Sequence, residues 1–144
     1  MSAKGKPNFD LVLTDEDIQT KFELWMKWLK DEKGVSHNTF SAYHRDLRFF
    51  IIFISDHLGK KISRSDLENL NQMDFRSYLS QRTSNGISRN SLRRSISALK
   101  NFFSYLELRH NIFNSSVKLI QAQKIPSSVP RAITSNEILE IVNQ

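Results

Sequence analysis

The residues whose chemistry is simplest to state are basic side chains in the second half of the chain. No acidic residue occurs between Asp74 and Glu107. The same stretch contains six basic residues, Arg76, Arg82, Arg89, Arg93, Arg94 and Lys100. An α-helix would place Arg89, Arg93 and Lys100 within about 40° of one another. Guanidinium groups bind phosphate and guanine edges, so the pattern favours a nucleic-acid ligand, although a solvated face explains any single arginine.

An earlier segment repeats this arrangement. Segment 34–54, GVSHNTFSAYHRDLRFFIIFI, aligns with segment 86–106, GISRNSLRRSISALKNFFSYL, at an offset of 52 residues (86 minus 34). Each copy has a glycine, an apolar residue, a serine suited to cap a helix, and an amphipathic helix. The first copy would direct these polar residues outward: His37, Asn38, Ser41, Arg45 and Arg48. Helix starts attract phosphate and the DNA major groove admits a helix, whereas a general similarity among capped amphipathic helices is the alternative explanation of the repeat.

Residues that could support catalysis or metal binding do not cluster in the sequence. Cysteine is absent, no Gly-rich phosphate loop is present, and the four histidines are scattered at His37, His44, His57 and His110. Apolar stripes, which are typical of core positions rather than of nucleophiles, contain the three tyrosines, Tyr43, Tyr78 and Tyr105. We therefore expect no catalytic residue, no metal site and no cofactor in this chain.

The apolar periodicity predicts an all-α fold, a compact bundle of four main helices followed by a linker. Glycine and proline are scarce and lie between the periodic segments. The first helix is expected after Thr14, which forms a variant capping box with Asp17, and Gly34 ends it. Trp25 is expected in the core and Trp28 at its rim.

Three further helices complete the predicted bundle. The second begins after Ser36, the third covers about residues 73–83, and the fourth begins after Ser88. Short helical turns are expected after Ser65 and near residues 115–121. The inward stripe of the fourth helix consists of Leu92, Ile96, Leu99, Phe102, Phe103 and Leu106. That of the second consists of Phe40, Tyr43, Leu47, Phe50, Ile51 and Ile54. Its C-terminal half is expected to be buried nearly all round, because three apolar residues widen the stripe: Phe49, Ile52 and Phe53.

A change in composition predicts a domain boundary. The segment KIPSSVPR, residues 124–131, has two prolines and no periodicity, as a linker does. Thr134 and Glu137 then form a capping box before another apolar stretch, so we expect an N-terminal fragment of a longer protein. The expected parts are a flexible tail over residues 1–13, a binding domain over residues 14–122, and a linker with the first helix of a truncated domain over residues 123–144.

Net charge and hydropathy limit the class of protein. The formal net charge is +6 and the isoelectric point is about 9.7, which favours polyanionic partners. No apolar run approaches the roughly 20 residues of a membrane span, and the N-terminus lacks the apolar region of a signal peptide. We therefore expect a soluble, cytoplasmic protein without a membrane partner, and a monomer for the isolated chain.

Four stretches together resemble a known family. GVSHNTFSAYHRDLRFF, MDFRSYLSQR, GISRNSLRRSISALKNFFSYL and KIPSSVPRAITSNEI are similar to the N-terminal core-binding domain of tyrosine recombinases, the phage integrase family, and most of all to its XerC/XerD branch. The resemblance covers about residues 15–144. It implies a SAM-like bundle whose second and fourth helices enter the major groove of a recombination half-site. It also implies that the segment after residue 122 leads into a catalytic domain.

The resemblance also indicates which residues contact DNA. By position, the first contact helix corresponds to Ser36, His37, Asn38, Thr39, Tyr43 and Arg45. The second corresponds to Ser88, Arg89, Asn90, Ser91, Arg93, Arg94 and Lys100. The family cuts DNA with a tyrosine nucleophile of its C-terminal domain, and no counterpart of that site is found here. Leu108-Arg109-His110 is interpreted as a helix end, where cations suit the helix dipole.

The expected function is therefore that of a DNA-binding module. The parent protein would be a site-specific recombinase that cleaves and rejoins strands, with other recombinase subunits in a tetrameric synaptic complex on double-stranded DNA. Chromosome dimer resolution, with its part in chromosome partition and cell division, and DNA integration are the implied processes, in the cytoplasm at the nucleoid. A SAM-like protein-interaction domain is one alternative, and a non-specific RNA binder is another.

Overall fold

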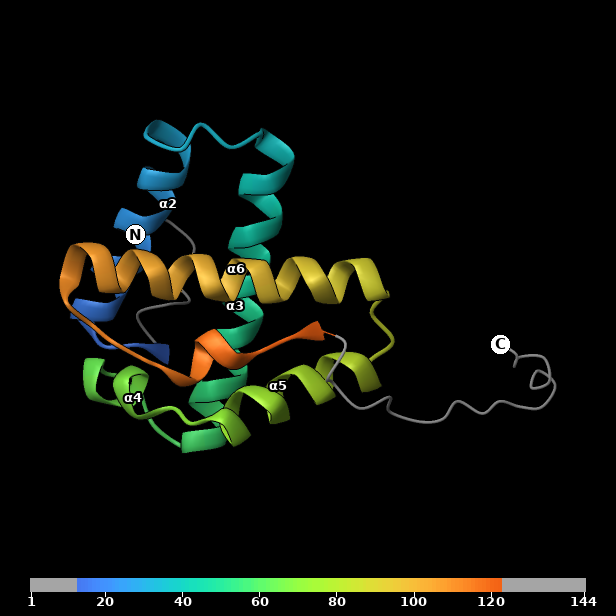
Figure 1. Cartoon of the computed structure of the whole chain (residues 1–144). Helices are drawn as coiled ribbons and strands as arrows, with labels where there is room; N and C mark the ends of the chain where they lie inside the picture. The colour runs from blue at the N-terminus through green and yellow to red at the C-terminus, as the bar shows by residue number, and fades with distance from the viewer. Residues whose placement is uncertain (1–12, 123–144) are drawn as a thin grey trace, which may run out of the picture.

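Helices alone form the regular structure of residues 13–122, the part of the chain that this computed structural model describes (Figure 1). The elements are α2 (Glu16–Asp31), α3 (His37–Leu58), α4 (Arg64–Asn69), α5 (Gln72–Ser84), α6 (Arg89–His110) and the 3-10 helix η1 (Ser116–Leu119). The predicted all-α fold is confirmed. The expected tail, linker and capping box at Thr134 fall outside the described residues, apart from residue 13. None of the described helices combines the length and hydrophobicity that a membrane span requires.

Serine caps start the two longest helices at the predicted residues. Ser36 accepts a hydrogen bond from the backbone N–H of Thr39, and Ser88 accepts one from the backbone N–H of Ser91. Each cap satisfies an amide that the first helical turn leaves unpaired. At the end of α5, Gly86 has a φ of 87°, a left-handed conformation that glycine adopts without strain, and the chain turns there into α6.

The predicted cap of the first helix is wrong. Asp15, not Thr14, caps α2 by accepting a hydrogen bond from the N–H of Ile18. Thr14 is buried and lies opposite Ile62 in an isolated β-bridge, in which Asp15 N–H donates to Ile62 O at 3.0 Å. This pairing holds the chain extended up to Asp15, so the helix can begin only afterwards. The short helix α4 likewise begins earlier than predicted, after a capping box between Ser63 and Asp66.

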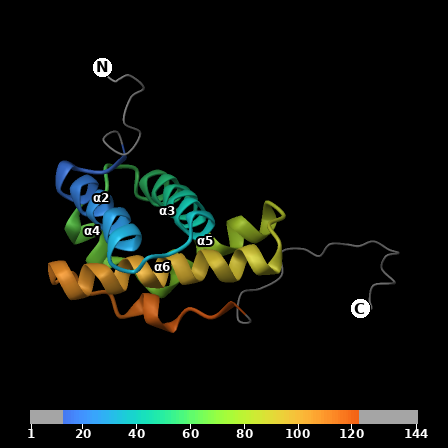
Figure 2. The same cartoon turned by 90° about the horizontal axis from the view of Figure 1, so that it is seen from above.

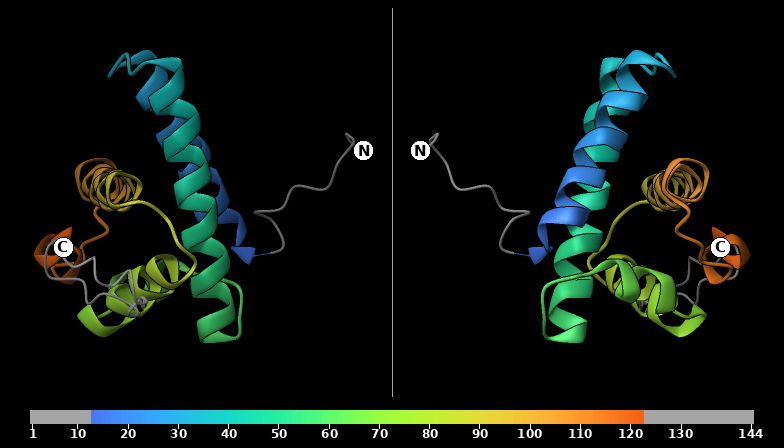
Figure 3. Two further views of the ribbon diagram at one scale, coloured as in Figure 1. Left: turned by 90° about the vertical axis from the view of Figure 1, so that its right-hand side faces the viewer. Right: turned by 90° about the vertical axis from the view of Figure 1, so that its left-hand side faces the viewer.

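The helices form a hairpin with a third long helix across it. The antiparallel helices α2 and α3 lie side by side, as the view from above shows (Figure 2). Helix α6 crosses both, and α4, α5 and η1 lie below α6 in Figure 1, where α5 packs against both α3 and α6 (Figures 1 and 3). Ala42 of α3 and both Ser95 and Ala98 of α6 are buried. Such small side chains allow two helices to approach closely where they cross.

Aromatic rings fill the space between these helices. Trp25, Phe50, Phe75 and Phe102 are each at most 2% exposed. The Phe102 ring lies edge-on to Trp25, with centroids 5.1 Å apart, and Phe50 stacks on Phe75 at 5.8 Å. Edge-on and stacked arrangements add to the stabilisation from burial. The predicted core stripe of α6 is confirmed, as are the core position of Trp25 and the rim position of Trp28, which packs against the core half-buried.

The expectation of all-round burial for the C-terminal half of α3 is wrong. Phe49 is 38% exposed and Ile52 is 43% exposed. The helices α2, α5 and α6 pack against α3 but leave these two residues partly open to solvent, with the Arg82 side chain of α5 over the Phe49 ring. The wide apolar stripe of α3 therefore led us to expect more burial than the neighbouring helices provide.

Replacing Phe102 with alanine should destabilise the fold by about 3–5 kcal/mol, because the substitution leaves a cavity between α2 and α6. Urea denaturation followed by circular dichroism measures this change. The matched control is Phe113→Ala, at a phenylalanine that is 56% exposed, and it should change the free energy of unfolding by less than about 1 kcal/mol. Equal losses in the two variants would contradict the assignment of Phe102 to the core.

Candidate nucleic-acid interface

The N-terminal halves of α3 and α6 border an open hollow of about 440 Å³. Each helix extends past the other at the crossing (Figure 1). The hollow is formed by side chains of both helices. It is lined by His37, Asn38, Thr39, Ser41, Ala42, Arg45 and Arg94. Apart from Ala42, these side chains donate or accept hydrogen bonds, and two of them are guanidinium groups. The structure thus brings Arg94 of the second predicted contact helix next to residues of the first.

Ser36 and Ser88, two of the predicted contact residues, use their side-chain oxygens within the helix caps. Ser36 Oγ accepts from Thr39 N at 3.1 Å and also lies 3.1 Å from Thr39 Oγ1. Ser88 Oγ accepts from Ser91 N at 3.1 Å. Their observed role is to start the helices, which places the positive ends of two helix dipoles beside the cationic side chains.

Arg94 is held by a buried carboxylate. Its Nε donates to Asp46 Oδ2 at 2.9 Å and its second terminal nitrogen donates to Asp46 Oδ1 at 3.0 Å. Asp46 of α3 is only 2% exposed, whereas the Arg94 side chain is 34% exposed. The hydrogen bonds that Arg94 donates to Asp46 raise the pKa of Arg94, so its guanidinium group stays charged at any physiological pH. The absence of acidic residues between Asp74 and Glu107 therefore does not leave Arg94 without an acidic partner, because Asp46 comes from a different helix.

Asp46 is the important residue that the sequence analysis missed. It lies four residues after Ala42 and four before Phe50, both of which are buried. A charged residue at helical spacing between two core residues must find a buried partner, since an isolated buried charge is very costly. That spacing was the available signal. The identity of the partner, 48 residues away, was not available from the pattern.

Tyr43 and His44 lie on the inner sides of α3. Tyr43 is half-buried and stacks on Trp25, with centroids 6.3 Å apart, as expected of a residue on the core stripe. Burial, and then the nearby charge of Asp46, raises the pKa of Tyr43. His44 packs near Phe22 at 5.5 Å, and burial together with the charge of Arg48 lowers the pKa of His44. A DNA contact by Tyr43 stays a prediction.

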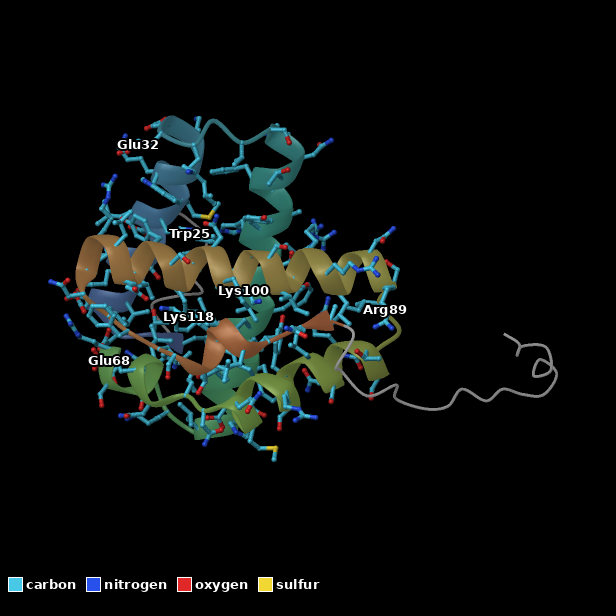
Figure 4. All side chains as sticks on the ribbon, viewed as in Figure 1. Trp25, Glu32, Glu68, Arg89, Lys100 and Lys118 are labelled. Atoms are coloured by element: carbon cyan, nitrogen blue, oxygen red, sulfur yellow. The ribbon has the colours of Figure 1, made fainter. Side chains whose placement is uncertain are left out.

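The other basic residues of α6 are distributed along its exposed side. Arg93 is exposed and donates to Asn90 Oδ1 at 3.4 Å. Arg89, labelled in Figure 4, lies at the start of the helix and donates to Ala122 O at 3.3 Å. Lys100 lines a separate hollow of about 220 Å³ beside η1. The structure therefore does not bring Lys100 into the hollow that contains Arg45, and the predicted contact residues of α6 face more than one neighbour.

The described residues form a polar binding surface, and the metal-ligating side chains among them do not cluster. Among residues 13–122 no group of histidine, aspartate and glutamate side chains could hold a metal ion. Tyr78 and Tyr105 are buried in the core as predicted, at 1% and 4% exposure. What the hollow can do chemically is attract an anion and exchange hydrogen bonds with it.

Comparison with known proteins identifies related sequences. Residues 22–110 match the family described as phage integrase, N-terminal SAM-like domain. The chain is 32% identical to a protein named tyrosine recombinase XerC from Rhizobium meliloti and 30% identical to one of the same name from Brucella suis, over 92% of this chain and 42% of each relative. It thus spans about two fifths of the length of the curated relatives that it matches. No solved structure matches the chain.

Replacing Arg94 with alanine should lower the free energy of unfolding by about 2–4 kcal/mol, because Asp46 would remain buried without its partner. Denaturation with urea measures this change, because urea is uncharged and does not screen the ion pair as guanidinium chloride would. Arg93→Ala removes the same side chain from an exposed neighbouring position and should cost less than about 0.5 kcal/mol. Comparable stability of the two variants would show that the pair does not hold the crossing.

The half-buried His44 should make stability depend on pH. Its pKa is lowered in the folded chain, so the unfolded chain binds the proton more readily, and stability should fall as the pH drops through the ordinary histidine pKa of about 6.5. In His44→Gln this part of the loss between pH 7 and pH 5 should disappear from urea titrations. An identical pH profile in both proteins would contradict the burial of the neutral ring.

Proposed function

This chain belongs to the phage integrase N-terminal SAM-like domain family, and on that basis we propose that α3 and α6 bind the major groove of double-stranded DNA at a recombination half-site. In this proposal residues 14–122 are the DNA-binding domain, residues 123–144 lead into a catalytic domain, and the parent protein is a Xer-like tyrosine recombinase. That parent would cleave and rejoin DNA together with other recombinase subunits in a tetramer, in chromosome dimer resolution or DNA integration in the cytoplasm.

The observation that carries the proposal is the hollow at the capped start of α3, which Arg94 of α6 also lines. It presents Arg45 and Arg94 with the amide of Asn38 and the hydroxyl of Ser41. Arginine and asparagine form paired hydrogen bonds with guanine and adenine edges, and helix starts attract phosphate. The major groove is about 12 Å wide, which accommodates a helix. The two crossing helices would each supply one such start to the groove.

Two alternative ligands make different demands on this surface. A protein partner is usually held by exposed aromatic anchors at the centre of an interface, whereas the lining of the hollow is polar and cationic. Double-stranded RNA has a deep, narrow major groove that helices do not enter, so it would bind through its backbone alone. The proposal therefore requires a preference for duplex DNA over duplex RNA of matched sequence.

Fluorescence anisotropy with labelled duplex DNA at several salt concentrations tests the proposed function. Each phosphate neutralised by a cation contributes about −0.9 to the slope of log affinity against log salt. The triple variant Arg45→Ala, Arg89→Ala, Arg93→Ala should bind more weakly, with a slope shallower by about 2–3. Arg94 is left in place because its loss would also disturb the fold.

Arg76→Ala is the control for charge. Arg76 is exposed on α5, away from the hollow, and its removal should alter affinity and slope by no more than a small uniform amount. The proposal fails if the triple variant keeps the wild-type slope, or if duplex RNA of the same sequence binds as tightly as DNA.

A further inference from the structure

A second cationic feature lies outside the hollow, where α5 meets α3. The guanidinium carbon of Arg82, in the last turn of α5, lies 4.2 Å from the centroid of the Phe49 ring of α3. At this distance the guanidinium group is attracted by the ring face, which restrains its position. The ring itself is 38% exposed, so the stacked pair reaches the surface. Neither residue belongs to the contact residues that the resemblance indicates.

Arg82 has unused hydrogen-bonding capacity. Its Nε is buried and donates no hydrogen bond. Across residues 13–122, no oxygen accepts a hydrogen bond from the terminal nitrogens either. The nearby carbonyls of Gln81 and Thr83 at the end of α5 accept from the backbone instead, Gln81 O from Asn85 N–H and Thr83 O from Gly86 N–H. The negative end of the α5 dipole favours a cation such as Arg82 at this position, but it provides no hydrogen-bond acceptor for the guanidinium N–H groups.

The stacked pair continues the surface that contains the hollow. Phe49 follows Arg45 by four residues, which is one helical turn or about 6 Å along α3. The side view shows α3 beside the start of α6 and the end of α5, so these elements share one side of the molecule (Figure 3). Asp46, the carboxylate of α3 nearest in sequence to Phe49, is already neutralised by Arg94. An anion approaching Arg82 therefore meets no free carboxylate from that turn.

We propose that Arg82, held against the Phe49 ring, forms a second phosphate-binding site for the backbone of the same DNA duplex. This inference rests on the proposed function and extends it to α5. Successive phosphates of one strand are 3.4 Å apart along the duplex axis, so a strand that passes Arg45 brings a further phosphate within reach of Arg82. A planar fork whose position is restrained binds a tetrahedral phosphate through two parallel N–H donors, which a lysine does not provide.

The test compares Arg82→Ala, Arg82→Lys and Phe49→Leu with the wild-type chain in salt-dependent anisotropy on duplex DNA. Arg82→Ala should make the slope shallower by about 0.9, so that raising salt from 50 to 200 mM costs it about 3.5-fold less affinity than it costs the wild type. Arg82→Lys should keep the slope but bind more weakly, because the charge remains without the fork. Phe49→Leu should weaken binding while leaving the charge unchanged.

Arg76→Lys and Arg76→Ala are the matched controls, since Arg76 lies six residues earlier on α5, about 240° around the helix from Arg82. Thermal denaturation of every variant identifies effects of altered folding, and Arg82→Lys serves as the folded comparison if Arg82→Ala unfolds. A second readout needs no DNA. Inorganic phosphate should shift the NMR signal of the Arg82 Nε–H in the wild type at lower concentrations than in Phe49→Leu.

The outcomes separate this site from the proposed function. If the wild type binds duplex DNA and Arg82→Ala keeps the full slope, the Arg82 site is wrong and the hollow remains the DNA interface. If the wild type binds no duplex, the proposed function fails, and a phosphate titration without a shift at Arg82 also removes the anion site. Binding of polyglutamate to Arg82 with no change of slope on DNA would assign the pair to an acidic protein partner and overturn the proposal.

Discussion

A carboxylate inside a helical bundle needs a cationic partner, and here that requirement fixes how α6 lies across α3. Asp46 is 2% exposed, and both of its oxygens accept hydrogen bonds from Arg94. The pair is short and bidentate, so it tolerates little sliding or rotation of one helix against the other. Because the hollow opens beside this pair and Arg94 is part of its lining, the same interaction positions the surface that we propose for DNA.

Apolar packing and polar contacts make different contributions where α6 crosses α2 and α3. The rings of Trp25, Phe50 and Phe102 provide burial, which is strong but specifies orientation only loosely. Trp25 Nε1 also donates to Asn101 Oδ1 at 2.8 Å, which adds a directional contact between α2 and α6. The indole and the Asp46 carboxylate are thus both paired with polar groups of α6. We infer that the burial stabilises the bundle while these two contacts select one crossing geometry.

The basic residues then have separable physical roles. Arg94 is structural and its remaining exposed surface faces the hollow. Arg45 and Arg93 are exposed and suit direct contact with a polyanion. Arg82 is stacked on an aromatic ring with unpaired donors. Under the proposed function, cations on α3, α5 and α6 would together bind the duplex. The relatives named tyrosine recombinase XerC are more than twice as long as the segment that this chain matches.

The sequence by itself determined the all-α class, the serine caps of α3 and α6, and the core stripe of α6. Caps and helical periodicity depend on residues within about one turn of each other, so a local pattern is enough to predict them. Tertiary structure alone decided the rest. Thr14 pairs with Ile62 instead of capping α2 as predicted. Phe49 stays partly exposed because the neighbouring helices cover only part of its side of α3. The partner of Arg94 lies 48 residues away, and a contact between distant segments follows from how helices pack, which a local pattern does not encode.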